Sequence, residues 1–192
     1  MDFDRDIIKT GAYVLHEGRF VFMVGFDEHR DKLNIVRLGG HREPGETPVQ
    51  CAIREVREEC TLEAAPFDAP ETFVEAGDGY VPLPEKPDSP RPVLIRQQAG
   101  APPGKLLAMY LMRGRGMPKP HMETQGLLSL DQAALGLVCD GCATLRTLRA
   151  QGAGAHLSAS LPEEMILTPT PQVRFLRWLL EARPAWMAGY LE

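Results

Sequence analysis

The 192-residue sequence predicts an α+β fold of one domain, with most strands in its first half and helices toward its C-terminus. Two observations lead to this prediction. Apolar runs typical of strands surround one short helical pattern in the first 113 residues, and leucine- and alanine-rich helical patterns follow from residue 132. Apolar residues make up 44% of the chain and charged residues 24%, as in ordinary globular proteins with a core.

The first quarter of the chain predicts three strands, at residues 7–16, 19–25 and 35–38. Glu17-Gly18 separates the first two and predicts a hairpin turn. Residues 26–34 are mostly polar and predict a loop. The third strand leads directly into Gly39-Gly40, so a strand, a tight turn and a helix are expected to follow one another.

A helix is predicted over residues 48–60, because Thr47 can cap its N-terminus and Pro48 suits the first helical position. Its apolar residues recur at helical spacing and predict an inward face made of Val49, Ala52, Ile53, Val56 and Cys60.

The same helix places three carboxylates, Glu55, Glu58 and Glu59, at i, i+3 and i+4. Like charges at this spacing repel one another, and a hard divalent cation such as Mg²⁺ would neutralise them through oxygen ligands. The alternative is a solvated acidic face in which Arg54 and Arg57 form ordinary surface pairs.

Later elements are less regular. Residues 71–76 predict a strand, and residues 77–104 form a proline-rich insertion whose one β-like interlude is 93–95. Residues 105–113 are almost entirely apolar and predict a central strand. A basic loop is expected at 114–120. The chain from about 131 to 192 is expected to be a C-terminal helical part. It would contain helices at 132–137 and 142–150, a glycine-rich linker at 151–155, and a final amphipathic helix that begins at 168–171.

The stretch from Gly40 to Leu62 has the spacing of a known motif. It resembles the Nudix box, Gly-x5-Glu-x7-Arg-Glu-U-x-Glu-Glu-x-Gly-U with U aliphatic. The matching positions are Gly40, Glu46, Arg54, Glu55, Val56, Glu58, Glu59 and Leu62. Thr61 stands where the family usually has glycine, which questions the turn at the helix end and not the acidic residues.

The resemblance implies a Nudix-type α/β/α sandwich with a central mixed sheet. It also implies divalent-metal-dependent hydrolysis of a phosphoanhydride in a nucleoside diphosphate linked to another group. The implied substrates are a nucleotide sugar, ADP-ribose, a dinucleoside polyphosphate or a (d)NTP, and the implied cofactor is Mg²⁺, with Mn²⁺ as an alternative ion. The insertion at 77–104 is a candidate for substrate choice, or a surface excursion without function.

Roles follow from the resemblance residue by residue. Glu58 and Glu59 are expected to bind metal directly, and Glu55 is expected to be a ligand or the base that activates water. The carbonyl of Gly40 is a further candidate ligand. Arg54 is expected to orient a carboxylate such as Glu46 and is counted among the catalytic residues.

Candidates outside the motif carry less weight. Glu123 lies where relatives often supply another metal ligand or base. An exposed loop carboxylate without a catalytic role is an equally good interpretation of Glu123. His121 could titrate near neutrality, and the lone Tyr80 could stack on a base. The pair Cys139 and Cys142 has C-x-x-C spacing, for which reduced structural thiols are favoured over redox or zinc chemistry.

Charge and composition exclude other classes of function. The net charge of −5 argues against binding a nucleic-acid polymer, so a small-molecule nucleotide is the expected partner, and a homodimer is left open. No stretch predicts a membrane span, and the acidic Met1–Asp6 segment does not resemble a secretory signal, so a cytoplasmic location is expected. The alternative function is a non-catalytic Nudix-fold module that binds a nucleotide; the intact acidic trio favours the enzyme.

Overall fold

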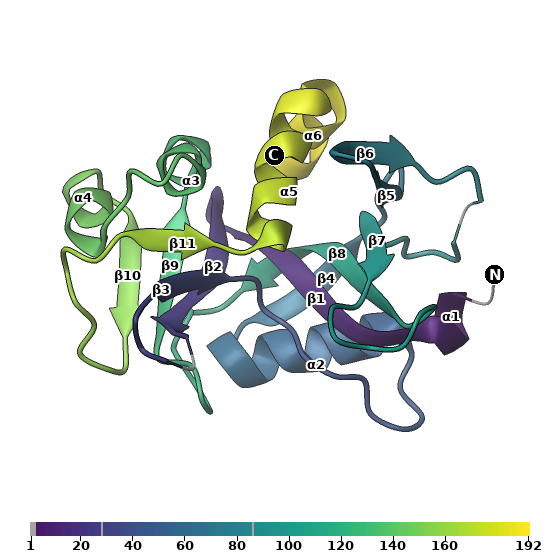
Figure 1. Cartoon of the computed structure of the whole chain (residues 1–192), viewed down its shortest axis with the longest axis horizontal. Helices are drawn as coiled ribbons and strands as arrows, with labels where there is room; N and C mark the ends of the chain where they lie inside the picture. The colour runs from purple at the N-terminus through teal and green to yellow at the C-terminus, as the bar shows by residue number, and fades with distance from the viewer. Residues whose placement is uncertain (1–2, 28, 86) are drawn as a thin grey trace.

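The computed structural model describes residues 3–27, 29–85 and 87–192 (Figure 1). Glu28 of the expected loop, Lys86 of the insertion and the Met1–Asp2 pair lie outside the described residues. Within the described ranges no helix is both long and apolar enough to cross a membrane. The described strands form one eleven-stranded mixed sheet, with helices on both of its faces (Figure 1).

The strands are β1 Ile7–His16, β2 Arg19–Phe26, β3 Leu33–Val36, β4 Glu63–Phe67, β5 Phe73–Ala76, β6 Gly79–Pro82, β7 Leu94–Gln97, β8 Leu106–Arg115, β9 Gly126–Leu130, β10 Gly154–Leu157 and β11 Leu167–Pro169. The helices are α1 Phe3–Asp6, α2 Pro48–Cys60, α3 Gln132–Cys139, α4 Leu145–Ala150, α5 Pro171–Ala182 and α6 Pro184–Leu191. The main path of the sheet runs β10-β9-β2-β1-β8-β7-β5-β6, with β3, β4 and β11 paired beside it.

The centre of the sheet is the parallel pair β1 and β8, which aligns Ile7 with Leu106 and Leu15 with Arg113. Both strands are buried along most of their length, which fits their nearly continuous apolar sequences. The predicted hairpin between β1 and β2 is confirmed. Glu17 and Gly18 both have positive φ, 49° and 75°, as a two-residue type I′ turn requires.

The two faces of the sheet have separate apolar cores. On one face α2 packs Ala52 and Val56 against strand residues such as Val14 and Met112. On the other face α3 to α6 form a larger core that includes Phe175. The expected α/β/α sandwich, with a mixed central sheet and C-terminal helices, is therefore the observed fold (Figure 1).

Two expectations about irregular regions need correction. The β-like interlude at 93–95 is confirmed, because it overlaps β7 and Val93, Leu94 and Ile95 are fully or almost fully buried. The insertion at 77–104 also contains β6, so it belongs partly to the sheet. The part from residue 131 onward is not purely helical. It contains β10, which pairs with β9, and β11, which pairs with β3, and it ends with the additional helix α6.

Candidate active site

Helix α2 begins and ends where its sequence predicts. The Thr47 hydroxyl accepts from Gln50 N and the Gln50 side chain accepts from Thr47 N, which completes a capping box. At the other end Thr61 adopts the left-handed conformation, with φ 63°, that a glycine would usually occupy. The helix thus keeps the motif's geometry despite the substitution. Its buried face is made of Cys51, Ala52, Val56 and Cys60, together with Pro48.

The C-terminal carbonyls of α2 are bound by the loop that follows β8. His121 donates from Nδ1 to Glu58 O (2.9 Å) and from its amide to Glu59 O (3.2 Å), and Lys119 N donates to Cys60 O (3.0 Å). A carbonyl only accepts, so Nδ1 of His121 must carry a proton. These bonds satisfy groups that a helix leaves without partners and fix this loop against the acidic helix.

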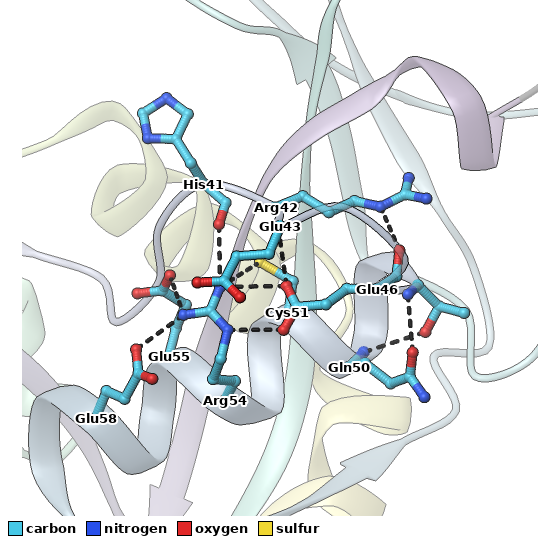
Figure 2. Close-up of polar contacts among 10 residues, drawn as sticks. His41, Arg42, Glu43, Glu46, Gln50, Cys51, Arg54, Glu55 and Glu58 are labelled. Atoms are coloured by element: carbon cyan, nitrogen blue, oxygen red, sulfur yellow. Dashed lines mark hydrogen bonds and ion pairs between the residues drawn. The ribbon is translucent and has the colours of Figure 1, made fainter.

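Arg54 joins the carboxylates of the loop and of the helix (Figure 2). Its Nε lies 2.7 Å from Glu46 Oε1, and its Nη1 lies 2.9 Å from Glu55 Oε1 and 2.8 Å from Glu58 Oε2. Nη2 also donates to the carbonyl of His41 (3.0 Å). The expected pairing of Arg54 with Glu46 is present, and the same guanidinium additionally orients two of the three helix glutamates.

Glu59 lies in a different environment from its neighbours on α2. Its Oε2 accepts a hydrogen bond from Gly39 N at 2.6 Å. Burial raises the pKa of its carboxyl to about 7, against the opposing effects of the Gly39 amide and the charge of Arg37. Removal of Glu59 from water therefore makes its charge costly, and a cation bound beside it would offset that cost.

Gly40 provides the space into which Glu55 projects. A Cβ at position 40 would collide with all three atoms of the Glu55 carboxylate. The carbonyl of Gly40 accepts from Thr10 N (3.0 Å), which fixes the turn to β1 and leaves the oxygen's second lone pair. The glycine is thus needed for the close approach of the turn to the helix.

Two cations near the site were missed by sequence reasoning. Arg37 is only 5% exposed, and its Nη1 donates to Gly39 O. A Cβ on Gly11 would collide with Cδ and Nε of Arg37, so the strand glycine makes room for this side chain. Lys9 is half-buried on β1, where its backbone bridges His41. An isolated glycine inside the first strand was the one signal in the sequence that pointed to Arg37.

The outer candidates are arranged differently. Glu123 is exposed on a turn two residues after His121, which binds the loop to the Glu58 carbonyl of α2. The ring of Tyr80 packs against Phe175 and Trp178, with centroids 4.7 and 4.8 Å away. Tyr80 is half-buried and packs against the core on the sheet face opposite α2, and the expectation that it stacks on a base stays a prediction.

The four cysteines are free thiols. Cys139 ends α3 and is half-buried, and Cys142 is exposed. Among the residues with described positions, the His, Cys, Asp and Glu side chains form no group of three that could hold a metal ion. A metal ion bound at the glutamates would therefore have to replace Arg54 as the partner of some of their oxygens.

Comparison with known proteins agrees with this geometry. Residues 9–103, which begin within β1 and include the whole motif, match the family model described as NUDIX domain. The chain belongs to the Nudix family. No curated protein matches the sequence.

Solved structures with the Nudix fold resemble this one at low identity. A Caenorhabditis elegans Ap4A hydrolase in a binary complex is 12% identical with a TM-score of 0.49, over 94% of this chain and 98% of that chain. The Escherichia coli ORF135 protein is 18% identical with a TM-score of 0.47, over 94% and 95%. A Nudix-family hydrolase from Clostridium perfringens is 14% identical with a TM-score of 0.47, over 67% and 82%.

Proposed function

We propose that this Nudix protein hydrolyses a phosphoanhydride bond in a nucleoside diphosphate linked to another group, with Mg²⁺ or Mn²⁺ as cofactor. The observation that carries the proposal is that Glu59 and Glu55 both meet the Gly39-Gly40 turn, while Arg54 joins Glu58 to Glu55. A purely solvated acidic face would not hold Glu59 half-buried against a backbone amide or need a glycine beside Glu55.

The donor set fits a hard divalent cation. All candidate ligands are oxygens, namely the three carboxylates and the Gly40 carbonyl, and Mg²⁺ prefers such ligands. The turn beside Glu55 is a cradle that any side chain at position 40 would fill. When bound, divalent ions would neutralise phosphate charge and activate water.

The protein's own groups have separate roles in this proposal. Glu58 and Glu59 supply ligand oxygens, and Glu55 is a ligand or takes the proton from the attacking water. Arg54 positions Glu55 and Glu58 through its hydrogen bonds (Figure 2). In the reaction the water oxygen bonds to phosphorus, the anhydride P–O bond breaks, and the leaving phosphate keeps the bridging oxygen. Glu123, exposed on a loop fixed to α2, is a further candidate for the base.

The exposed tip of the proline-rich insertion is the segment we propose for choosing the group attached to the diphosphate. Its buried part, β7, serves the sheet and is excluded from that role. The exposed residues before β7 can vary without removing core contacts. The proposed role of this tip is limited to substrate preference and does not include the hydrolysis step.

A non-catalytic Nudix module that binds nucleotides is the second candidate. It is favoured by one observation: Arg54 already engages oxygens of Glu55 and Glu58, and the described glutamates form no gathered metal site. Under this alternative the chain would bind a nucleotide without turnover, and the carboxylates would be structural partners of Arg54.

A substrate panel separates the two candidates. ADP-ribose, nucleotide sugars, dinucleoside polyphosphates and (d)NTPs are incubated with Mg²⁺ or Mn²⁺, and products are quantified by chromatography. The enzyme predicts metal-dependent cleavage of at least one class, lost in Glu58→Gln and retained in Glu63→Gln, an exposed acid just beyond the helix. Binding of a nucleotide with no cleavage under any condition would establish the module instead.

A further inference from the structure

Two cations lie beside the glutamates, on the β1 side of the site, without a carboxylate in contact. Arg54 has three carboxylates within ion-pair distance. In contrast, neither Lys9 nor Arg37 forms an ion pair with any residue that the structure describes. A buried or half-buried cation without a close counterion is costly, so this arrangement needs an explanation.

Both cations nevertheless lie within the field of the acidic helix. Burial, and next the charge of Arg37, lower the pKa of Lys9, whereas Glu55 and Glu59 raise it. Burial also lowers the pKa of Arg37, and Glu59 is the largest opposing influence. The glutamates therefore attract both cations from a distance but do not neutralise them by contact, which leaves the Lys9 ammonium able to receive another anion.

The backbone holds these cations next to the turn that carries the glutamates. Arg37 donates to Gly39 O, and Gly39 N donates to Glu59 Oε2 (2.6 Å), so one residue links the buried cation to the half-buried Glu59. Lys9 is held at the same turn, because Thr10 N donates to Gly40 O (3.0 Å) and Lys9 bridges His41. The position of both charges relative to the glutamates is thus fixed by main-chain contacts.

We propose that Lys9 and Arg37 form an anion subsite that receives a phosphate group of the substrate beside the carboxylate cluster. The inference rests on the proposed function only for the identity of the ligand. Lys9 supplies a compact charge that can contact a phosphate oxygen, as lysines commonly do. Arg37, held beneath the Gly39-Gly40 turn, adds a fixed positive charge behind it.

The alternative is that both residues are only counterions for the glutamates. The two explanations differ in the ligand whose affinity changes. Removing a counterion of the glutamates alters cation binding, whereas removing an anion ligand weakens anion binding. Methylenediphosphonate, a non-hydrolysable pyrophosphate analogue, is the probe for the anion. Mn²⁺ in the absence of any phosphate is the probe for the metal, and calorimetry measures both.

Lys9→Met is the decisive variant, because Lys9 is half-buried and the change removes charge at similar length. Methylenediphosphonate in Mg²⁺ buffer should bind about tenfold or more weakly, as expected for loss of a charge-assisted hydrogen bond. Mn²⁺ should bind no more weakly than in the wild type. Lys105→Met is the matched control. Lys105 is also half-buried, adjoins Leu106, which pairs with Ile7, and lies 3.7 Å from Asp6, so this variant should bind the analogue like the wild type.

Equal analogue affinity in Lys9→Met and wild type would overturn the subsite. So would a parallel loss of Mn²⁺ affinity, or the same loss of analogue binding in Lys105→Met. Arg37→Lys keeps the buried charge while weakening the contact with Gly39, and should reduce analogue affinity less than Lys9→Met does. The analogue binding is measured without turnover. These measurements can therefore refute the subsite without refuting hydrolysis, and the substrate panel can refute hydrolysis without refuting the subsite.

Discussion

Glu55, Glu58 and Glu59 carry the same functional group but lie in three environments. Glu58 is the most exposed and shares Arg54 with Glu55, whereas Glu59 bonds to the Gly39 amide beneath the turn. Burial raises the pKa of Glu59 to about 7. Of the three, Glu59 therefore has the most to gain from a bound cation.

Glu59→Gln should reduce turnover by about 10² to 10³, because it removes a charged ligand from a preorganised site. The amide oxygen can still accept from Gly39 N, so the melting temperature should stay near that of the wild type. Steady-state kinetics at saturating Mg²⁺ test this, with Glu63→Gln as the control. Near wild-type turnover in Glu59→Gln would remove Glu59 from the catalytic machinery.

Thr61 permits a second test at the residue scale. Thr61→Gly and Thr61→Ala both lose the hydroxyl that donates to Met117 O (3.1 Å), and they differ only in Cβ. At φ 63° the Cβ is unfavourable, so the glycine variant should be more stable by about 1 kcal/mol. Urea denaturation measures the difference. If the Thr61→Ala variant were at least as stable as the Thr61→Gly variant, the left-handed cap would be absent in solution.

At the scale of elements, local signals were sufficient for some segments and not for others. Helix α2 was predicted to the residue, because its cap, its proline and its apolar spacing are all local. β4 contains Pro66, and β10 and β11 are only four and three residues long. These strands exist because distant partners pair with them, which no local pattern shows.

The same distinction applies to the site. The acidic trio and the Arg54–Glu46 contact were predictable because the motif fixes their spacing within 14 residues of one another. Arg37 and Lys9 come together only through the pairing of β1 with the Gly39-Gly40 turn. The contacts of Tyr80 with Phe175 and Trp178 were not predictable, because these partners lie almost 100 residues away.

β7 gives a prediction about the insertion. Leu94 is 1% exposed in the larger core, so Leu94→Ala should lower the free energy of unfolding by about 2–5 kcal/mol. Val81 in the same insertion is 44% exposed, and Val81→Ala should change stability by less than about 0.5 kcal/mol. Chemical denaturation of both variants tests this. Equal, small effects would mean that the insertion is not part of the sheet.

The anchor of the insertion should respond to acid. Arg91 donates from its amide (2.8 Å) and from Nη2 (2.7 Å) to the carboxylate of Asp68, and the Arg91 side chain is the main reason that the pKa of Asp68 is held at about 2. A lowered folded pKa adds stability above the unfolded value near 4, and this stability disappears as the pH falls toward 2.

Asp68→Asn should therefore be less stable than the wild type at pH 6, and the difference should shrink between pH 4 and 2. Asp78→Asn, at an exposed position, is the control and should show no such trend. A pH-independent difference for Asp68→Asn would show that the ion pair is not what anchors the segment.

For the whole molecule, the carboxylates and cations of the site are held by both the helix and the sheet, so ion binding should stabilise the entire fold. A ligand that binds only the folded state stabilises by mass action, about 2.7 kcal/mol at a hundred times its dissociation constant. Melting temperatures in MgCl₂ or MnCl₂ should exceed those in EDTA and in NaCl of matched ionic strength.

The triple variant Glu55→Gln/Glu58→Gln/Glu59→Gln should lose this metal-dependent shift. Its melting temperature should be the same in MgCl₂ and in NaCl of equal ionic strength. Shifts of the same size in the variant and the wild type would refute a metal site at these glutamates.

The parallel pairing of β1 with β8 also has a consequence for biosynthesis. Ile7 lies opposite Leu106, so about 100 residues must be translated after β1 before its central partner exists. At roughly 5–20 residues per second this takes about 5–20 s. During that interval the β1–β2 hairpin has left the ribosome with its apolar edge uncovered. The nascent chain is then most exposed to chaperones and to aggregation, well before the acidic helix can be held against a completed sheet.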